Sequence, residues 1–538
     1  MPEIRLEHIN KRWKNFYAVD DLNMVIEDNA FVTLLGPSGC GKTTTLRMIA
    51  GLETPTDGKI TIGNRVVFDS KMGINIPANK RKVGFLFQNY ALWPNMTVYQ
   101  NISFGLTNIK EEMLKIDFEA KNNARIAQIL AHPADVVKVF DECKGKDGKL
   151  DQTRAILKLI DTFTISQFTA KRLMAYDYSK KDFSTEIAEL NSKVEAAKAQ
   201  NKLDKDFVFT EDGKQVKVDR KLTKEEIDLA VRRVSRIVKI GMFMDRYPAE
   251  LSGGQQQRVA IARTLAPEPT VLFMDEPLSN LDAKLRLEMR YELQRLHVET
   301  GSTFVYVTHD QMEAMTLATQ ICLINNGVLQ QYEPPLTVYS KPNNLFVADF
   351  VGNPSVNFIE AKGIQNKDGD IELTILDGVK ATFKPAKKLD LAKWFNDRDA
   401  SAAQAAKDLF EKSKQKGYVE KGNKDEVFRY HIAKVVEEDD SLMEEPVLTN
   451  EDFVLGVRPE FVDIDKETGI NGEIYGAMPT GMESTIKIAV NGFLLTGVVF
   501  GNTQFRIGTK VSVNFKGSEI MLFDRKSGKC ITLGKLTV

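Results

Sequence analysis

The stretch Gly36-Pro37-Ser38-Gly39-Cys40-Gly41-Lys42-Thr43 decides the fold, because it matches the pattern G-x-x-x-x-G-K-[ST] at every fixed position. The apolar run Phe31–Leu35 before it is typical of a buried strand, and Thr44–Ala50 after it suits a helix. In that setting, successive backbone N–H groups curl around phosphate oxygens at a helix N-terminus. The pattern therefore predicts a nucleotide site, with Lys42 on the β- and γ-phosphates and the Thr43 hydroxyl on Mg²⁺.

Length and composition limit the class of protein. The chain has 538 residues, more than one hydrophobic core organises, so we expect at least two domains. Its formal net charge of -1 gives no global case for nucleic-acid binding. Four scattered cysteines show neither metal-ligand spacing nor a disulfide framework, which fits a reducing cytosol. No apolar run approaches the roughly 18 residues that a membrane span needs, so other chains would have to do any spanning.

Three further stretches carry groups suited to nucleotide chemistry. An apolar strand-like run ends at Gln88, which places a neutral amide near the predicted phosphates. Leu251-Ser252-Gly253-Gly254-Gln255 opens a helix and offers a second set of backbone N–H groups for an anion. The run Thr270–Met274 reads as a buried strand that ends at Asp275 and Glu276. Ligands of open α/β sheets bind at such strand ends.

Taken in order, these pieces resemble the nucleotide-binding subunit of an ATP-binding-cassette (ABC) transporter. The matching motifs are the Walker A loop (Gly36–Thr43), the Q-loop (Gln88), the LSGGQ signature (Leu251–Gln255), Walker B (Val271–Asp275), the D-loop (Ser279–Asp282) and the switch histidine (His309). The resemblance implies an α/β P-loop NTPase fold, namely an ABC ATPase domain with a helical subdomain.

The amino-acid sequences of several stretches resemble those of one subfamily, the maltose and glycerol-3-phosphate importer ATPases. These stretches are Phe87–Pro94, Pro277–Asp282, Leu345–Gly352 and Gly456–Glu460. The last of them resembles a marker of that subfamily's C-terminal β-barrel, an OB/TOBE-like regulatory domain. We therefore expect an ABC nucleotide-binding domain over residues 1–354 and the C-terminal domain over 355–538.

Two segments depart from the family pattern. Residues from about 107 to 221 read as an inserted, mostly helical segment in the helical subdomain, and the family pattern resumes at the capping box Thr223-x-x-Glu226. The insertion carries no chemical motif, so a small helical addition and a partner-binding module both remain open. A second insertion, at about 390–450, leaves open whether the C-terminal domain still binds a regulator.

The resemblance assigns a task to each site residue. Glu276 is the implied general base for the attacking water, with His309 and Gln88 as further catalytic residues. Thr43, Gln88 and Asp275 are the implied Mg²⁺ ligands. Trp13 falls where the family keeps the aromatic residue that stacks on the nucleotide base. ATP would contact Trp13, Gly36, Pro37, Ser38, Gly39, Cys40, Gly41, Lys42, Thr43 and Thr44 of one copy. It would also contact Ser252, Gly253, Gly254, Gln255 and Asp282 of a second copy.

The stretch Tyr90–Val98 is unusually apolar for a loop, and an exposed apolar patch indicates a docking site. The predicted permease-docking residues are Ala91, Leu92, Trp93 and Met96. The implied partners are a second nucleotide-binding subunit, most simply in a homodimer, and two integral-membrane permease subunits. An extracellular solute-binding protein or lipoprotein would act indirectly, and nucleic acid is not expected. The chain would sit peripherally on the cytoplasmic face of the cell membrane.

The function implied is ATP hydrolysis that drives uptake of a carbohydrate or related solute, such as a sugar, glycerol or glycerol-3-phosphate. Import of a polyamine or another small solute is one alternative. A soluble ABC ATPase outside transport is another, although such proteins usually carry two cassettes or a long coiled coil. The solute contacts other subunits, so this sequence does not choose among these solutes.

Overall fold

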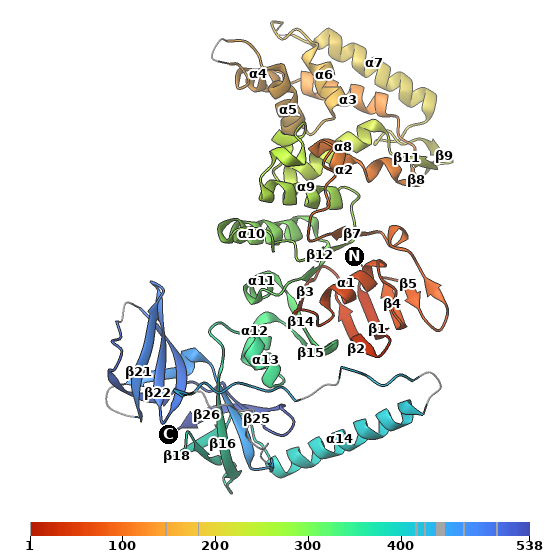
Figure 1. The fold of residues 1–538 in the computed structure, drawn as a ribbon. Helices are drawn as coiled ribbons and strands as arrows, with labels where there is room; N and C mark the ends of the chain where they lie inside the picture. Colours follow the sequence, from red (N-terminus) through yellow and green to blue (C-terminus); the bar gives the residue numbers. More distant parts are fainter. Residues whose placement is uncertain are drawn as a thin grey trace. The chain divides into compact units, whose positions relative to one another are not determined.

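The computed structural model describes residues 2–145, 148–180, 182–414, 418–423, 427–436, 447–465, 469–501 and 504–538 (Figure 1). Residues 437–446 of the predicted insertion at about 390–450 lie outside the described residues. The chain forms two compact units. Unit 1 comprises Met1–Arg81 and Val305–Val538, and unit 2 comprises Lys82–Phe304.

Unit 1 begins with an antiparallel sheet of strand order β2-β1-β4-β5-β6, so β2 is an edge strand. Its strands are β1 (Ile4–Trp13), β2 (Phe16–Ile26), β4 (Asp57–Ile62), β5 (Arg65–Asp69) and β6 (Ile74–Asn75). Ile4 and Leu6 are buried along β1 with the period of two of a half-buried strand, and a register shift between Leu6 and Ile9 brings Ile9 to the buried side as well. Trp13 pairs with Phe16 where β1 turns into β2, and both rings are exposed.

The predicted phosphate-binding loop follows a strand buried on both faces, as parallel strands usually are. This strand, β3 (Phe31–Leu35), pairs in parallel with β14 (Gln320–Asn325), which pairs antiparallel with β15 (Val328–Glu333). Helix α1 (Lys42–Ala50) begins directly after the loop. A shared apolar cluster packs β3 and β14 against α11 (Gln311–Leu317), α12 (Pro335–Ser340) and α13 (Leu345–Phe350). The α/β core and the strand–loop–helix order are as predicted.

The C-terminal part of unit 1 contains a closed six-stranded barrel of order β16-β17-β18-β26-β25-β19. Its strands are β16 (Asn357–Gln365), β17 (Ile371–Ile375), β18 (Val379–Pro385), β19 (Asp452–Val457), β25 (Ile520–Asp524) and β26 (Cys530–Thr537). A second sheet, of order β20-β24-β21-β22-β23, has strands β20 (Val462–Asp465), β21 (Ile470–Pro479), β22 (Glu483–Val490), β23 (Phe493–Phe500) and β24 (Lys510–Phe515). The predicted OB/TOBE-like β-barrel class is confirmed.

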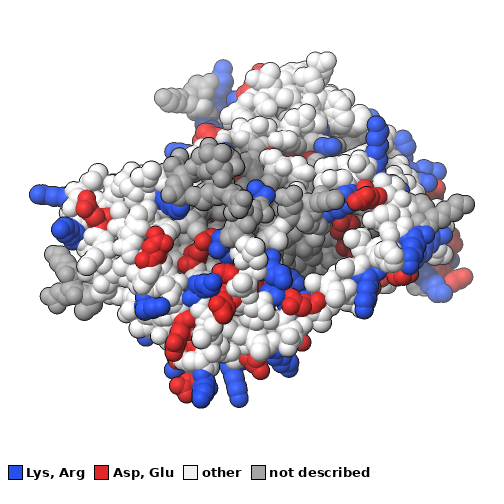
Figure 2. All heavy atoms as spheres, turned by 60° about the horizontal axis from the view of Figure 1, so that its bottom comes forward, with Lys and Arg blue, Asp and Glu red and all other residues white. Residues whose placement is uncertain are grey.

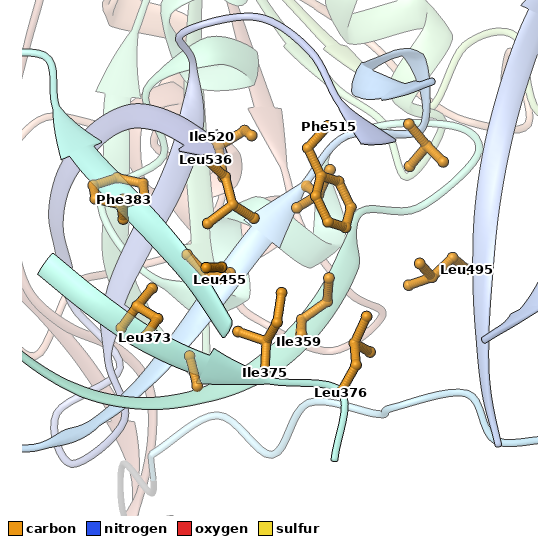
Figure 3. Packing of buried hydrophobic residues seen from close by; sticks show 14 of the residues in the cluster. Ile359, Leu373, Ile375, Leu376, Phe383, Leu455, Leu495, Phe515, Ile520 and Leu536 are labelled. Atoms are coloured by element: carbon orange, nitrogen blue, oxygen red, sulfur yellow. The ribbon is translucent and has the colours of Figure 1, made fainter. Parts of the chain in front are cut away.

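The barrel and the second sheet share one apolar core (Figure 3). Ile359, Leu373 and Phe383 point into it from barrel strands, and Leu495 and Phe515 join it from the second sheet. Helix α14 (Leu391–Ser413) follows β18 and packs only its first turns on this core. Beyond a buried ion pair between Arg398 and Asp524 of β25, 2.9 Å between nitrogen and oxygen, its side chains are exposed.

In unit 2, β7 (Val83–Leu86) pairs in parallel with β12 (Val271–Asp275). The strands are accompanied by α2 (Val98–Ser103), α8 (Lys224–Ile237), α9 (Gly253–Leu265) and α10 (Ala283–Thr300). Strand β13 (Thr303–Val307) crosses the boundary to unit 1 in sequence. Helix α9 packs against α2, α8 and β7, which fixes the helix that carries the signature motif.

Residues after α2 form a helical body within unit 2. It contains β8 (Lys110–Leu114), α3 (Phe118–Leu130), α4 (Pro133–Asp141), α5 (Gln152–Phe163), α6 (Gln167–Met174), α7 (Ser184–Asn201), β9 (Thr210–Glu211), β10 (Lys214–Gln215) and β11 (Lys217–Lys221). Its helices enclose their own apolar cluster, which includes Ile126, Leu159 and Leu173. Because β8 pairs antiparallel with β11, Lys110 lies opposite Lys221, and the body begins and ends at one place.

Candidate nucleotide and catalytic site

The phosphate-binding loop of unit 1 has a backbone that needs its glycines. Gly39 and Gly41 have φ angles of 79° and 104°, in the left-handed region that side chains disfavour. A Cβ on Gly41 would lie 2.1 Å from the carbonyl oxygen of Ala18, and one on Gly36 would lie 2.1 Å from that of Ile324. The loop is therefore packed tightly against neighbouring backbone on its inner side, while Ser38 and Gly39 are exposed on its outer side.

Lys42 lies inside this loop and is only 6% exposed. Its Nζ donates to the carbonyl oxygens of Gly36 (2.8 Å) and Pro37 (2.7 Å). The neighbouring Cys40 thiol is buried, and burial raises its pKa, so the thiol stays neutral and adds no negative charge beside the ammonium. The loop thus holds one concentrated positive charge at the start of α1, where Thr43 and Thr44 are half-buried.

The two carboxylates that end β12 have different environments in unit 2. Asp275 is buried, whereas Glu276 is half-buried and has a φ angle of 45°. Gln88 donates from Nε2 to the Glu276 carboxylate (3.2 Å) and to the Ser279 hydroxyl (3.4 Å). The Asn280 side chain in turn donates to the backbone carbonyl oxygen of Gln88 at 3.0 Å. The structure thus brings the predicted Q-loop, Walker B end and D-loop together around Glu276.

The switch histidine is exposed at the end of β13, in a turn held by a buried carboxylate. Tyr306 and Thr308 each donate a hydroxyl hydrogen bond of 2.7 Å to Glu313, which is 3% exposed. Asp310 caps α11 by accepting from the backbone N–H of Glu313 at 3.2 Å. The sequence reasoning missed Glu313, although the spacing Asp310-x-x-Glu313 is a helix-start signal that marks it. These contacts fix the direction in which His309 leaves the strand.

The signature motif is the N-terminus of α9. Ser252 caps the helix, accepting from the Gln255 backbone N–H at 3.4 Å, and the Gln255 side chain accepts from the Ser252 backbone N–H at 2.9 Å. The two glycines differ: a Cβ on Gly254 would lie 2.7 Å from the Leu285 side chain, whereas one on Gly253 has ordinary van der Waals space. Exposed Asp282 caps the neighbouring helix α10.

The predicted docking residues surround an exposed aromatic pair. The Trp93 ring, 38% exposed, lies 4.3 Å from the exposed ring of Phe104, measured between centroids. The Arg263 guanidinium lies 5.1 Å from the Trp93 ring and donates to the carbonyl oxygens of Tyr90 (2.7 Å) and Ala91 (2.6 Å). The sequence reasoning missed Phe104 and Arg263. Leu92 and Met96, from the same stretch, are half-buried.

The turn between β1 and β2 presents the predicted base-stacking aromatic. Trp13 is 49% exposed, and the Lys11 ammonium lies 5.3 Å from its ring centroid. Phe16, whose ring is also exposed, is opposite Trp13 in the strand register. This turn continues into Ala18, whose carbonyl oxygen packs on Gly41 of the phosphate-binding loop. Trp13 and the phosphate-binding loop are therefore linked within unit 1 through Ala18, which follows the Trp13 turn along β2 and contacts Gly41.

The fold places the chain in the class of P-loop NTPases. The sequence pattern of the ABC transporter family matches residues 19–180 and 164–279. The chain is 30% identical to the trehalose/maltose import ATP-binding protein MalK of Thermococcus litoralis, over 99% of this chain and 100% of the relative. It is 36% identical to the spermidine/putrescine import ATP-binding protein PotA of Onion yellows phytoplasma, over 68% of this chain and 76% of that relative. Among solved structures, cbiO1 of Clostridium perfringens is 20% identical, with a TM-score of 0.39 over 63% of this chain and 90% of that one.

The chain belongs to the ABC transporter family and is an importer ATPase, which binds and hydrolyses ATP. Within the residues that the structure describes, no helix has the length and apolar character that crossing a membrane requires. On the face shown in Figure 2, basic and acidic side chains are interspersed among uncoloured surface.

Proposed function

We propose that this subunit drives carbohydrate import as a homodimer that closes around two ATP molecules. A relative whose name specifies trehalose/maltose import aligns with the chain from end to end, C-terminal barrel included. Sugars, glycerol and glycerol-3-phosphate are the solutes that we propose. In the proposed organisation, residues 1–354 bind nucleotide and 355–538 regulate, with insertions at about 107–221 and 390–450.

The observation that carries the catalytic proposal is the hydrogen-bond network around Glu276. The Gln88 side-chain amide donates a hydrogen bond that orients the Glu276 carboxylate, and the Ser279 hydroxyl donates to the backbone carbonyl oxygen of Glu276. A carboxylate held in this way can polarise a water molecule for attack on a γ-phosphate, a contribution of about 10²–10⁴ in rate. His309, whose turn is fixed by Glu313, is proposed to donate a hydrogen bond to the γ-phosphate.

The donor set fits a magnesium ion. Mg²⁺ prefers oxygen ligands, and Thr43, Asp275 and Gln88 offer a hydroxyl, a buried carboxylate and an amide. Because Gln88 directs its side-chain nitrogen Nε2 toward Glu276, its side-chain oxygen Oε1 is the atom that it can present to a cation. When bound, the ion neutralises charge on the β- and γ-phosphates. In the proposal, Thr43 of the phosphate-binding loop and Asp275 hold it, with Gln88 joining in the closed state.

ATP is proposed to lie between two copies of the chain. One copy would contribute Trp13 and the loop residues Gly36–Thr44, with Lys42 exchanging its loop carbonyl partners for phosphate oxygens. The other would contribute Asp282 and the start of α9, residues Ser252–Gln255, of which Ser252 and Gly253 are exposed. Since ATP would then bind the closed dimer better than separate copies, its hydrolysis shifts the equilibrium back to the open state.

The aromatic pair Trp93 and Phe104 is the proposed contact with two integral-membrane permease subunits. Together with Ala91, Leu92 and Met96, it forms an apolar surface whose burial against a partner helix is favourable by roughly 1.5–3 kcal/mol per large side chain. This contact would hold the subunit at the cytoplasmic face of the cell membrane. A solute-binding protein or lipoprotein outside the membrane would act only through the permeases.

A second solute class has its own support. The phytoplasma relative, whose name specifies spermidine/putrescine import, is 36% identical over its matched region, against 30% for the trehalose/maltose relative. That higher identity covers only 68% of this chain, so the whole-length match favours carbohydrate.

Uptake in reconstituted vesicles separates the two solutes. The chain is assembled with the permease subunits that co-purify with it, and uptake of labelled maltose, glycerol-3-phosphate and spermidine is measured with ATP inside. The proposal expects carbohydrate uptake that Glu276→Gln abolishes. Spermidine uptake alone would overturn the carbohydrate proposal, and failure to capture any membrane protein would overturn the docking proposal.

A further inference from the structure

A segment of the C-terminal insertion covers the edge of the first sheet in unit 1. The side chain of Asn423 accepts from the Tyr17 backbone N–H at 2.9 Å and donates to the Tyr17 carbonyl oxygen at 2.9 Å. Tyr17 lies on the edge strand β2, opposite Arg12 of β1, and on its other side β2 has no neighbouring strand in this sheet. One amide side chain therefore satisfies both backbone groups of this residue, as a paired strand would.

Three more contacts hold the same segment, residues 418–423, against β2. The Gly422 N–H donates to the Asn15 carbonyl oxygen at 2.8 Å, and the Tyr17 hydroxyl donates to the carbonyl oxygen of Val419 at 3.1 Å. Lys421 forms an ion pair of 3.1 Å with Asp20. These contacts join residues some 400 positions apart in sequence, and they gather on the few residues that follow the Trp13 turn.

Tyr17 connects two walls of the proposed nucleotide site. In the register of the hairpin, Trp13 pairs with Phe16, which is the residue directly before Tyr17. On the other side, Ala18 packs its carbonyl oxygen against Gly41 of the phosphate-binding loop. An anchor at Tyr17 therefore fixes where the Trp13 ring stands relative to the loop that binds phosphate.

We propose that residues 418–423 form a brace that positions Trp13 for stacking on the nucleotide base, with Asn423 as its main positioning residue. This inference rests on the proposed role of Trp13 in binding ATP. A hairpin tip that is held before the ligand arrives loses less conformational freedom on binding, and stacking then adds more to affinity. The brace also links the C-terminal insertion to nucleotide occupancy, since such coupling acts in both directions.

Calorimetric titration of the full chain with ATP and with inorganic triphosphate tests the brace. Stacking of a base on an aromatic ring is worth about fivefold to 150-fold in affinity. Asn423→Ala is expected to lower ATP affinity within that range and to leave triphosphate affinity unchanged, because triphosphate has no base. Trp13→Ala should give a similar selective loss. The double variant should lose little more than either single one, because both act on the same contact.

Two further variants serve as controls, one for a cavity at position 423 and one for the loss of an asparagine outside the brace. Asn423→Asp keeps the shape of the side chain but replaces the donor to the Tyr17 carbonyl oxygen with a second acceptor, so it should lose ATP affinity without leaving a cavity. Asn366 also bonds backbone with its side chain, accepting from the N–H groups of Asp368 (3.1 Å) and Asp370 (3.0 Å) in a turn of the barrel. Asn366→Ala should therefore leave ATP affinity unchanged.

The possible outcomes separate the brace from the site it serves. Loss in Trp13→Ala together with wild-type ATP affinity in Asn423→Ala would overturn the brace alone. An unchanged Trp13→Ala would remove the stacking role, and the brace with it. Tighter ATP binding in Asn423→Ala would show that the segment obstructs the site, and a parallel loss of triphosphate affinity would show only general damage; both contradict the proposal.

Discussion

Replacing Arg263 with alanine should loosen the docking stretch while sparing the nucleotide site. Tyr90 and Ala91 have φ angles of 59° and 47°, and the left-handed conformation costs roughly 1–2 kcal/mol for each non-glycine residue. The two guanidinium bonds to their carbonyl oxygens offset this cost, since a hydrogen bond to a charged group contributes roughly 1.5–3 kcal/mol. Burial lowers the pKa of Arg263, yet a guanidinium stays charged at neutral pH.

Discounting for water at this half-buried site, we take the loss as about 3 kcal/mol. That free energy corresponds to about a hundredfold drop in hydrogen-exchange protection of the turn amides, among them Met96, whose N–H donates to the Trp93 carbonyl oxygen. Gln88 keeps its own bond from Asn280, so basal ATP hydrolysis should change by less than about threefold.

Two measurements test this prediction: hydrogen exchange over residues 88–98, followed by mass spectrometry, and the basal ATPase rate. Arg263→Lys is the matched variant, because it keeps the charge but lacks the planar fork that reaches two carbonyl oxygens. It should show an intermediate loss of protection. Unchanged protection in Arg263→Ala would refute the reasoning, as would a fall in basal ATPase activity as large as the fall in solute uptake.

Further variants test other parts of the site. Glu276→Gln should keep ATP affinity and lower hydrolysis by about 10²–10⁴, trapping an ATP-bound dimer visible by size-exclusion chromatography; normal turnover would exclude Glu276 as the base. In that background, Gly253→Ala should abolish the dimer without changing the melting temperature, because its Cβ fits within the subunit, whereas Gly254→Ala should lower the melting temperature through its overlap with Leu285. Replacing residues 107–221 with a short linker should leave ATP binding intact, because the paired ends of this body let the linker close; loss of calorimetric ATP binding would show that the body supports the core.

The phosphate-binding loop and the signature helix were predictable from sequence because each is built from neighbouring residues. A buried strand, a glycine loop and a helix start follow one another without interruption, so local pattern and structure agree there. The same holds for the caps at Ser252 and Thr223, each with its partner three residues later. Walker B was readable for a similar reason, as an apolar run that ends in two carboxylates.

The supports of the site could not be predicted, because their partners are distant in sequence. Arg263 lies 172 residues from Ala91, and nothing in the pattern of α9 distinguishes it from Arg258, the other basic residue of that helix. Phe104 reads as an ordinary apolar residue beyond α2, and only the fold places it on Trp93. Asn423 lies in an insertion without a family pattern, and a single polar residue there carries no local signal.

The position of Arg263 gives the signature motif a mechanical connection to the docking stretch. Helix α9 begins at the signature and carries Arg263 about ten residues later, roughly 15 Å along a rigid rod. Two hydrogen bonds and the contact with the Trp93 ring join that end to the docking stretch. If ATP on a partner subunit binds Ser252 and Gly253, a shift or tilt of α9 must carry Trp93 with it or break these bonds. Closure of the dimer would then reach the proposed permease contact through one helix, without any change at Gln88.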